Sequence, residues 1–445
     1  MGVEQVFVGR TSPFLYFYDM NKEMLRLAIP NIISNISVPL LSTVDTALMG
    51  RLSELHLGAV GVGAMIFNFV YWNFGFLRMG TTGITAQAFG KKDDNEIMQT
   101  ISRAMLVAFV LALLIFILQK PIGELSFYLM NISETQYGLV EDYFYIRIWA
   151  APATLALFAL MGWFFGMQNA IYPLILTVTI NLVNILFSFL LVKKYNMGVA
   201  GVAWGTVVAQ YVGLLLAIFL FQKKYKTYFQ FFSKKGTLEF KALSEFLSIN
   251  RDIFIRTFCL TFAFGFFYSQ SSSGGEIILA VNVILLQFLN WMSYGVDGFA
   301  FASESLVGKY KGAADQPNLK KAIQFSFVWG MGLAGLFSLI YWVFGIELLH
   351  IFTDKENIIA ASLPYLFWMV VFPIISTPCY LWDGIYIGLT ASRAMRQTML
   401  MAVVVYILFY FFLNEFGNHG LWAALLIFMV ARGLIQWAWY RKYLL

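Results

Sequence analysis

One carboxylate stands out because it lies inside an apolar stretch that is long enough to cross a membrane. Asp45 lies between Leu25 and Gly50, and Pro39 interrupts the same stretch one to two turns before it. About 20 residues at 1.5 Å per residue span the hydrocarbon of a bilayer. A carboxylate in such a helix costs roughly 2.5–3.5 kcal/mol on insertion scales, which favours a functional role. Two interpretations stay open: Asp45 takes up a coupling ion beside a bend at Pro39, or it reaches the headgroups at the outer end of the helix.

A polar stripe follows one face of a later apolar stretch. Its members are spaced by four, three and four residues, which places them on one side of a helix: Thr177, Asn181, Asn184 and Ser188. Thr206 lies in the next apolar stretch. The stripe suits either hydrogen bonds between helices, each worth about 0.6–2 kcal/mol, or a polar surrounding for the Asp45 carboxyl. The corresponding stretch of the second half, MLMAVVVYILFYFFL, has no such stripe, which favours a specific site in the N-terminal half.

Three further acids and one arginine lie in or beside apolar stretches. Asp297 and Glu304 are seven residues apart and share a helix face, and Asp383 lies in a later stretch. Arg78 lies at a depth comparable to Asp297 in an earlier stretch. An unpaired charge at that depth is costly, so we expect Arg78 to pair with Asp297 or Glu304 and to act as a gate. The alternatives are a solvated helix end for Glu304 and structural ion pairs for Asp297 and Asp383.

The composition places these residues in a membrane protein with many spans. Of the 445 residues, 60% are hydrophobic and only 12% are charged, about half the charged fraction of a soluble domain. The net charge of +6 lies mostly in short connections, so it indicates membrane orientation and not nucleic-acid binding. No phosphate-binding loop, HExxH or GxSxG motif is present. We therefore expect no enzyme, no metal and no cofactor, and transport that is passive or driven by an ion gradient.

The chain contains twelve apolar stretches that predict an all-α fold. They alternate with basic clusters that fall on one side, so the positive-inside rule predicts cytoplasmic termini in a plasma (inner) membrane protein. The domains expected are an N-terminal extension over 1–20, a six-helix lobe over 21–221, a cytoplasmic loop over 222–250 and a second six-helix lobe over 251–445. The predicted spans are 25–50, 57–79, 98–119, 137–163, 171–192, 199–221, 252–271, 277–301, 322–344, 358–387, 398–414 and 421–440.

An internal repeat relates the two halves. Gly162 and Gly166 recur 222 residues later as Gly384 and Gly388, and the pair Asn196 and Gly198 recurs at the same offset as Asn418 and Gly420. Because six is an even number of spans, both halves cross the membrane in the same orientation. Such halves form a parallel repeat, related by an axis along the membrane normal. The expected architecture is two six-helix lobes around a central cleft, with one lobe rocking against the other.

Several segments together resemble the multidrug and toxic compound extrusion (MATE) family of the MOP superfamily, and within it the branch of DNA-damage-inducible protein F (DinF). IPNIISNISVPLLSTVDTALMGRL resembles the first helix of that branch, and NLVNILFSFLLV with NMGVAGVAWGTVVAQY resembles the fifth and sixth. VNVILLQFLNWMSYGVDGFAFASESLVG resembles the eighth helix and LWDGIYIG the tenth. The resemblance extends from about Asn21 to the C-terminus.

The resemblance implies that Asp45 is the cation-coupling carboxylate and that Asn184 and Thr206 belong to its hydrogen-bonded surroundings. Many members of the branch place a second aspartate where this chain has Ser188. The acid cluster that suggests sodium coupling in the NorM branch is also missing, with Asp383 as the only comparable residue. Proton coupling is therefore favoured, and sodium stays open as the coupling ion.

We expect a cation-coupled antiporter that exports amphiphilic, often cationic drugs or metabolites as a monomer in the lipid bilayer. Aromatic residues, 18% of the chain, suit a cleft for lipophilic cations, although they also pack bundles. The alternative is a flippase for a lipid-linked saccharide or an exporter of an organic-acid metabolite. A groove of several cations would favour the flippase, and only Arg78 and Arg147 are expected in the membrane. The localised Asp45 site argues against a structural or channel-like protein.

Overall fold

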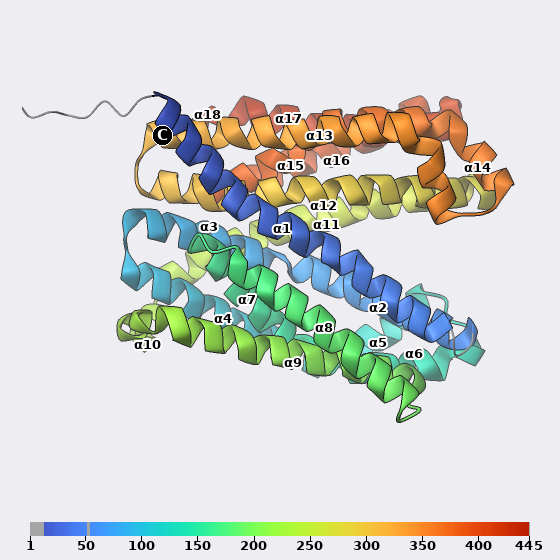
Figure 1. Cartoon of the computed structure of the whole chain (residues 1–445), viewed down its shortest axis with the longest axis horizontal. Helices are drawn as coiled ribbons and strands as arrows, with labels where there is room; N and C mark the ends of the chain where they lie inside the picture. The colour runs from blue at the N-terminus through green and yellow to red at the C-terminus, as the bar shows by residue number, and fades with distance from the viewer. Residues whose placement is uncertain (1–12, 51–53, 445) are drawn as a thin grey trace, which may run out of the picture.

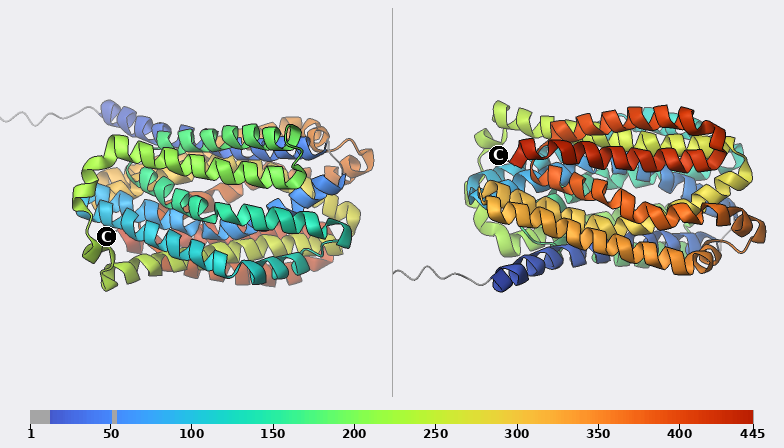
Figure 2. Two further views of the ribbon diagram at one scale, coloured as in Figure 1. Left: turned by 90° about the horizontal axis from the view of Figure 1, so that it is seen from below. Right: turned by 90° about the horizontal axis from the view of Figure 1, so that it is seen from above.

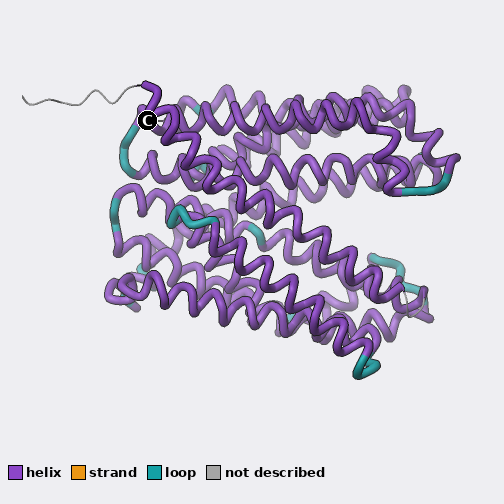
Figure 3. The backbone as a smooth tube through the Cα atoms, in the orientation of Figure 1, coloured by secondary structure: helices purple, strands orange, loops and turns teal. Residues whose placement is uncertain are grey.

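The computed structural model describes the backbone of residues 13–50 and 54–444 and the side chains of residues 19–37 and 55–443. All regular elements in this part of the chain are helices, and the short connections lie mainly at the two ends of the bundle (Figure 3). The first half contains α1 (Pro13–Gly50), α2 (Glu54–Phe74), α3 (Phe76–Lys91), α4 (Asp94–Ile117), α5 (Gln119–Leu129), α6 (Glu134–Arg147), η1 (Ile148–Ala150), α7 (Ala151–Gly166), α8 (Ile171–Lys193) and α9 (Gly198–Tyr225).

The second half repeats this order after a short linker. The linker contains η2 (Lys226–Phe231) and α10 (Lys234–Thr237). The helices that follow are α11 (Phe240–Ser273), α12 (Glu276–Gly312), α13 (Gln316–Phe352), α14 (Glu356–Ser362), η3 (Leu363–Tyr365), α15 (Leu366–Gly388), α16 (Ser392–Leu413), η4 (Asn414–Phe416), α17 (Gly417–Trp439) and α18 (Arg441–Leu444).

Ten helical stretches in the described residues are long and apolar enough to cross a membrane. One of them, 392–439, contains both α16 and α17, which pack against each other. When α16 and α17 are counted separately and α1 is added, the ten stretches give the twelve spans that the sequence predicts. Helix α1 already begins at Pro13, so the described part of the expected N-terminal extension continues the first helix. Likewise, the predicted span 277–301 belongs to a helix that continues to Gly312, because hydropathy marks the hydrocarbon and not the helix end.

The chain forms two lobes, each with its own hydrophobic core, and Figure 1 shows them one above the other. Two helices cross between the lobes. Met24 and Leu27 of α1 belong to the core of the C-terminal lobe, while Phe246 and Ile253 of α11 belong to the core of the N-terminal lobe. The two crossing helices lie on opposite edges of the molecule (Figure 2). The first helix of each half therefore supports the other lobe.

Matching glycines show that the repeat extends to helix packing. Gly162 of α7 lies so close to α3 that an added Cβ would collide with the Arg78 carbonyl oxygen. Gly384 of α15 lies in the same way against the Ala300 carbonyl oxygen of α12. All four positions are related by the offset of 222 residues, so α7 packs on α3 as α15 packs on α12. Glycine is needed at both contacts because any side chain would separate the backbones.

The same offset relates the turns at one end of the bundle. Lys92 and Ala314 both adopt the left-handed backbone conformation, with φ of 57° and 54°. The next residue in each half, Asp93 or Asp315, caps the following helix by accepting a hydrogen bond from a backbone N–H. The two halves are thus copies of one unit down to individual turns, as the sequence repeat predicts.

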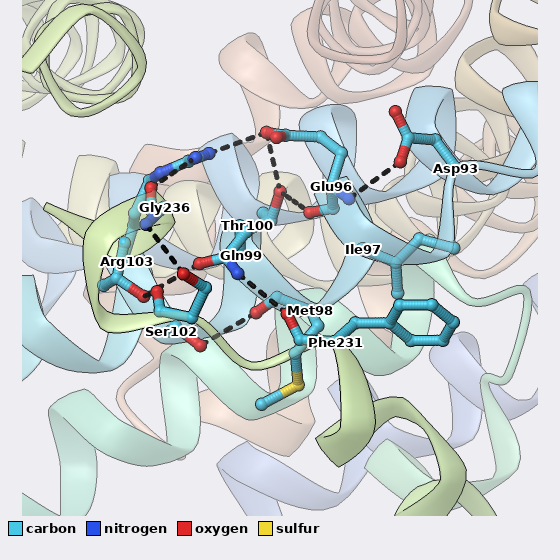
Figure 4. Close-up of polar contacts among 12 residues, drawn as sticks. Asp93, Glu96, Ile97, Met98, Gln99, Thr100, Ser102, Arg103, Phe231 and Gly236 are labelled. Atoms are coloured by element: carbon cyan, nitrogen blue, oxygen red, sulfur yellow. Dashed lines mark hydrogen bonds and ion pairs between the residues drawn. The ribbon is translucent and has the colours of Figure 1, made fainter. Parts of the chain in front are cut away.

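The linker between the halves is fixed to α4 by hydrogen bonds (Figure 4). Gln99 donates to the Phe231 carbonyl oxygen at 2.9 Å and accepts from Thr237 at 2.8 Å. Arg103 is 3% exposed and donates to the Gly236 carbonyl oxygen at 3.0 Å and to Glu96 at 2.7 Å. Most of the expected loop over 222–250 therefore has helical structure, and its middle part is attached to the N-terminal lobe.

Candidate functional site

The polar face of α8 meets α9 inside the N-terminal lobe. Asn184 Nδ2 donates to Thr206 Oγ1 at 2.8 Å, and both residues are buried. The Asn184 oxygen Oδ1 and the Ser188 hydroxyl are also buried, and neither has a hydrogen-bond partner in the described part of the chain. A buried polar atom without a partner costs about 1–3 kcal/mol. This pair of oxygens is therefore a place where a proton donor or a cation would be stabilised.

The other members of the polar stripe have different partners. Asn181 Nδ2 donates to the hydroxyl and the carbonyl oxygen of Ser37 on α1, both at 3.2 Å. The Thr177 hydroxyl donates to the Pro173 carbonyl oxygen within its own helix. The stripe predicted from the spacing therefore divides into three: Thr177 bonds its own backbone, Asn181 bonds α1, and Asn184 bonds α9.

Asp45 and Pro39 lie in the part of α1 whose side chains are outside the described residues. The backbone of α1 is helical through both positions and ends at Gly50. Helix α1 packs against α8, and both helices start at the same end of the bundle (Figure 1). The structure therefore places the backbone of Asp45 on a helix that runs parallel to the polar face of α8.

The two lobes are joined by an ion pair between α3 and α12. Arg78 Nη1 lies 3.1 Å from Glu304 Oε2, and the Glu304 side chain is only 2% exposed. The guanidinium group also lies over the Phe301 ring, 4.1 Å from its centroid. Of the two acids that the sequence offers as partners for Arg78, Glu304 is the one that pairs. The solvated helix end considered for Glu304 is wrong, because its carboxylate is buried.

Close backbone contacts surround this ion pair at the end of the bundle where α3, α7, α12 and α15 terminate. Gln87 of α3 donates to the Gly388 carbonyl oxygen at 2.9 Å, and Gln168, just after α7, donates to the Ser305 carbonyl oxygen at 2.9 Å. A Cβ on Gly312 would collide with the backbone of Gln87. The lobes are therefore closed against each other at the end that also carries the start of α1 and the basic connections.

Helix α1 is anchored at the same end. Glu23 accepts from Lys309 Nζ at 3.0 Å and from the Tyr310 hydroxyl at 2.7 Å. Asn21 accepts from the Trp329 indole at 2.8 Å. These contacts attach the first turns of α1 to the C-terminal lobe, whereas its later residue Ser37 contacts the N-terminal lobe.

Asp383 on α15 is the centre of a buried charged network in the C-terminal lobe. Its Oδ2 accepts from Arg432 of α17 at 2.6 Å and from Arg256 of α11, and its Oδ1 accepts from Gln436 at 2.8 Å. All four residues are buried. Asp383 therefore has structural partners, one of the two roles that the sequence leaves open for it.

Asp297 on α12 lies between this network and the ion pair across the lobes. It is within electrostatic reach of both Arg256 and Arg78. In the described part of the chain its carboxylate makes no hydrogen bond or ion pair. The structural ion pair considered for Asp297 is therefore not found among the described residues.

The expectation that only Arg78 and Arg147 are embedded is wrong. Arg256 and Arg432 are 7% and 1% exposed within helices long enough to span a membrane. A signal for them was present, since both lie inside predicted spans, 252–271 and 421–440, where an unpaired charge is costly. Asking which acid could neutralise them would have pointed to Asp383. No group of three or more His, Cys, Asp or Glu residues is placed to hold a metal ion in the residues that the structure describes.

Two helical lobes related by a parallel repeat, with long apolar helices and buried polar groups between them, define a multi-pass membrane transporter. The chain belongs to the MatE family, whose model matches residues 30–190 and again residues 253–415. The two matches cover the two halves of the internal repeat. Members of this family are transporters and not enzymes.

Individual relatives agree with this assignment. DNA damage-inducible protein F of Escherichia coli K12 is 36% identical over 424 residues, covering 95% of this chain and 92% of the relative. Protein DETOXIFICATION 44, a chloroplastic protein of Arabidopsis thaliana, is 25% identical over 94% of this chain and 81% of its own. An outward-facing multidrug resistance MATE family transporter of the MOP superfamily has the same fold, with a TM-score of 0.86, 18% identity and coverage of 96% of both chains.

Proposed function

We propose that this transporter is a proton-coupled antiporter that exports amphiphilic, often cationic drugs or metabolites, with Asp45 as the coupling carboxylate. The observation that carries the proposal is the pair of buried oxygens, Asn184 Oδ1 and Ser188 Oγ, that lack partners in the described residues beside the Asn184–Thr206 hydrogen bond. Such a site stabilises a protonated carboxyl, which donates a hydrogen bond, or a small cation.

The register between α1 and α8 supports Asp45 as the group that reaches this site. The contact between Ser37 and Asn181 fixes the two parallel helices relative to each other. Asp45 follows Ser37 by eight residues and Ser188 follows Asn181 by seven, which is about 10–12 Å along each axis at 1.5 Å per residue. The backbone of Asp45 is therefore at the depth of Ser188, in the half of the helix that is outward by the predicted orientation.

Antiport requires that proton and substrate bias the same two-state element in opposite directions. Protonated Asp45 would donate a hydrogen bond to the free oxygens of α8 and change the bend at Pro39, which would shrink the cavity of the N-terminal lobe. Ionised Asp45 would leave room and negative potential for a cationic substrate. Competition for one carboxylate is sufficient to couple export to the proton gradient.

The ion pair between the lobes supplies the second requirement, which is a gate. Arg78 and Glu304 lie at the closed end of the bundle, which we place in the cytoplasm because the basic connections lie there. Opening that end requires separating the two charges, so substrate uptake from the cytoplasm must offset this cost. We further propose that the membrane is the plasma (inner) membrane and that both termini are cytoplasmic.

The charge balance favours a cationic over a pyrophosphate-bearing substrate. Arg256 and Arg432 are both bound to Asp383, and Arg78 is bound to Glu304. All three of these embedded arginines are therefore already engaged with buried carboxylates and do not form an open cationic groove. This argues against the alternatives, a flippase for a lipid-linked saccharide or an exporter of an organic acid.

Transport by the purified protein in liposomes tests the proposal. Vesicles would be loaded so that either a proton gradient or a sodium gradient is imposed, and movement of a lipophilic cationic dye would be followed by fluorescence. We expect the proton gradient to drive dye movement and the sodium gradient alone to have little effect. Dye movement driven only by sodium would overturn the choice of coupling ion, and no gradient-driven movement would overturn antiport of such cations.

A further inference from the structure

The outer face of the C-terminal lobe contains an apolar groove that is separate from the sites described above. It encloses about 760 Å³ between α13 and α17, with α15 as its floor. The right-hand view of Figure 2 looks onto this face, which points away from the N-terminal lobe. Except for Gln324, the side chains around it are apolar or aromatic, among them Val328, Pro378, Trp382, Gly433 and Trp437. The groove therefore faces the region where lipid surrounds the protein.

Two cations mark one end of the groove. Lys320 precedes Gln324 by four residues on α13 and so lies on the same helix face as this lining residue. Arg441 is the first residue of α18 and directly follows Tyr440, another residue that lines the groove. Both side chains are exposed. Trp437 and Tyr440 lie beside them, and these residue types prefer the membrane interface. The groove thus leads from a basic, aromatic interface into the hydrocarbon.

We propose that this groove binds an anionic phospholipid of the leaflet on the side of the basic connections. One acyl chain lies over Pro378 and Trp382, and the phosphate lies between Lys320 and Arg441. The volume is within the range of small-molecule sites, about 300–1,000 Å³, and the lining suits an alkyl chain. Cations placed at the end of an apolar groove favour an anionic over a zwitterionic headgroup.

Occupancy of the groove stabilises the charged network behind its floor. Trp382 contacts Phe327 and Tyr440, with ring centroids 5.1 and 4.8 Å apart, so it joins all three helices around the groove. The next residue, Asp383, is bound by Arg432 and Gln436 of α17 on the interior side. An acyl chain that holds α15 and α17 together on the outer side therefore supports the same helix contact.

Photo-crosslinking in nanodiscs tests the proposal. The protein would be labelled with phosphatidylglycerol or phosphatidylcholine that carries a diazirine in the acyl chain, and modified peptides would be mapped by mass spectrometry. The groove is blocked by Val328→Trp, whose position is exposed and outside the core, and Leu336→Trp is the matched control on the same helix. The headgroup site is removed by Lys320→Gln with Arg441→Gln, and Lys234→Gln with Lys235→Gln is the matched control.

We expect phosphatidylglycerol to label α13, α15 and α17 more strongly than phosphatidylcholine at low salt. Its apparent affinity should fall about five-fold for each cation removed. Val328→Trp should abolish labelling of the groove, and both controls should retain it. Equal labelling by the two lipids, or labelling that survives Val328→Trp, would overturn the proposal. Loss of dye transport in Val328→Trp with unchanged lipid labelling would instead identify a lateral entrance for substrate.

Discussion

Positions related by the repeat carry opposite chemistry in the two lobes. In the N-terminal lobe, Asn184 donates a hydrogen bond to Thr206. The corresponding positions of the C-terminal lobe, 222 residues later, are Tyr406 and Phe428, whose rings pack with centroids 5.5 Å apart. Where the C-terminal lobe has Asp383 bonded to Arg432, the N-terminal lobe has Met161 and Gln210. The same helix packing therefore holds a site of amide and hydroxyl groups in one lobe and a network of paired charges in the other.

This difference assigns separate tasks to the lobes. The oxygens of Asp383 already accept hydrogen bonds from two guanidinium groups and an amide, so they leave little room for a mobile ligand. A site made of amide and hydroxyl oxygens has free acceptors and can respond to a proton or cation. The comparison predicts that charge changes in the C-terminal lobe affect stability first, whereas changes in the N-terminal lobe affect transport first.

The largest effect on stability is expected from Asp383→Ala. Removing the carboxylate leaves Arg256 and Arg432 buried without a counter-ion, and breaking a buried pair in this way costs about 3–5 kcal/mol. Met161→Ala, at the corresponding position of the N-terminal lobe, is the matched control. Thermal unfolding in detergent should show a much lower midpoint for Asp383→Ala than for the control. Equal midpoints would contradict the structural role of the network.

Arg78→Ala should reduce transport strongly, because the ion pair with Glu304 closes the cytoplasmic end when the cleft opens outward. Loss of a buried pair costs several kcal/mol, and each 1.4 kcal/mol shifts a conformational equilibrium about tenfold. Dye efflux from liposomes measures the loss. The charge exchange Arg78→Glu with Glu304→Arg should restore part of the activity, and failure of that rescue would count against a gate formed by this pair.

Ser188→Asp should change the ion dependence of transport. A second carboxylate beside Asn184 supplies another charged oxygen ligand, which hard cations such as sodium prefer, so we expect a sodium gradient to become effective. Ser188→Asn adds similar volume without charge and is the control. Sodium-driven dye movement in both variants, or in neither, would show that position 188 does not set the choice of ion.

The smallest effect is expected from Thr206→Val. This change removes the hydrogen bond from Asn184, and bonds of this kind between membrane helices are worth about 0.6–2 kcal/mol. Thr257→Val removes a buried hydroxyl that bonds only its own helix and serves as the control. The apparent affinity for the coupling ion should change only in Thr206→Val. A shift of the same size in the control would remove Thr206 from the site.

Much of the fold could be predicted from the sequence because it depends on composition and repetition. Apolar stretches and basic connections predict the spans, and Gly162 with Gly384 identifies the repeat because no other residue fits these contacts. The break between α2 and α3 at Gly75 was not predictable, since the hydrophobic stretch 57–79 continues through it.

The candidate site could be predicted only in part. The residue spacing placed Asn184 and Ser188 on one helix face. The similar expected depth of Arg78 and Asp297 in the membrane identified Asp297 and Glu304 as candidate partners of Arg78. The choice of Glu304 over Asp297 depends on how the lobes approach each other, which no local pattern contains. The partners of Asp383 come from α11 and α17, far away in the sequence, and side-chain spacing within one helix cannot reveal contacts between distant helices.

The most direct test of the division between the lobes compares Asp45→Asn with Asp383→Asn in the same liposome assay. Both changes remove one negative charge at almost constant volume. We predict that Asp45→Asn folds and inserts as the wild type does but loses dye transport driven by a proton gradient, whereas Asp383→Asn unfolds at a lower temperature and keeps more transport per folded molecule. Wild-type transport by Asp45→Asn under a proton gradient would contradict Asp45 as the coupling carboxylate and, with it, the central claim.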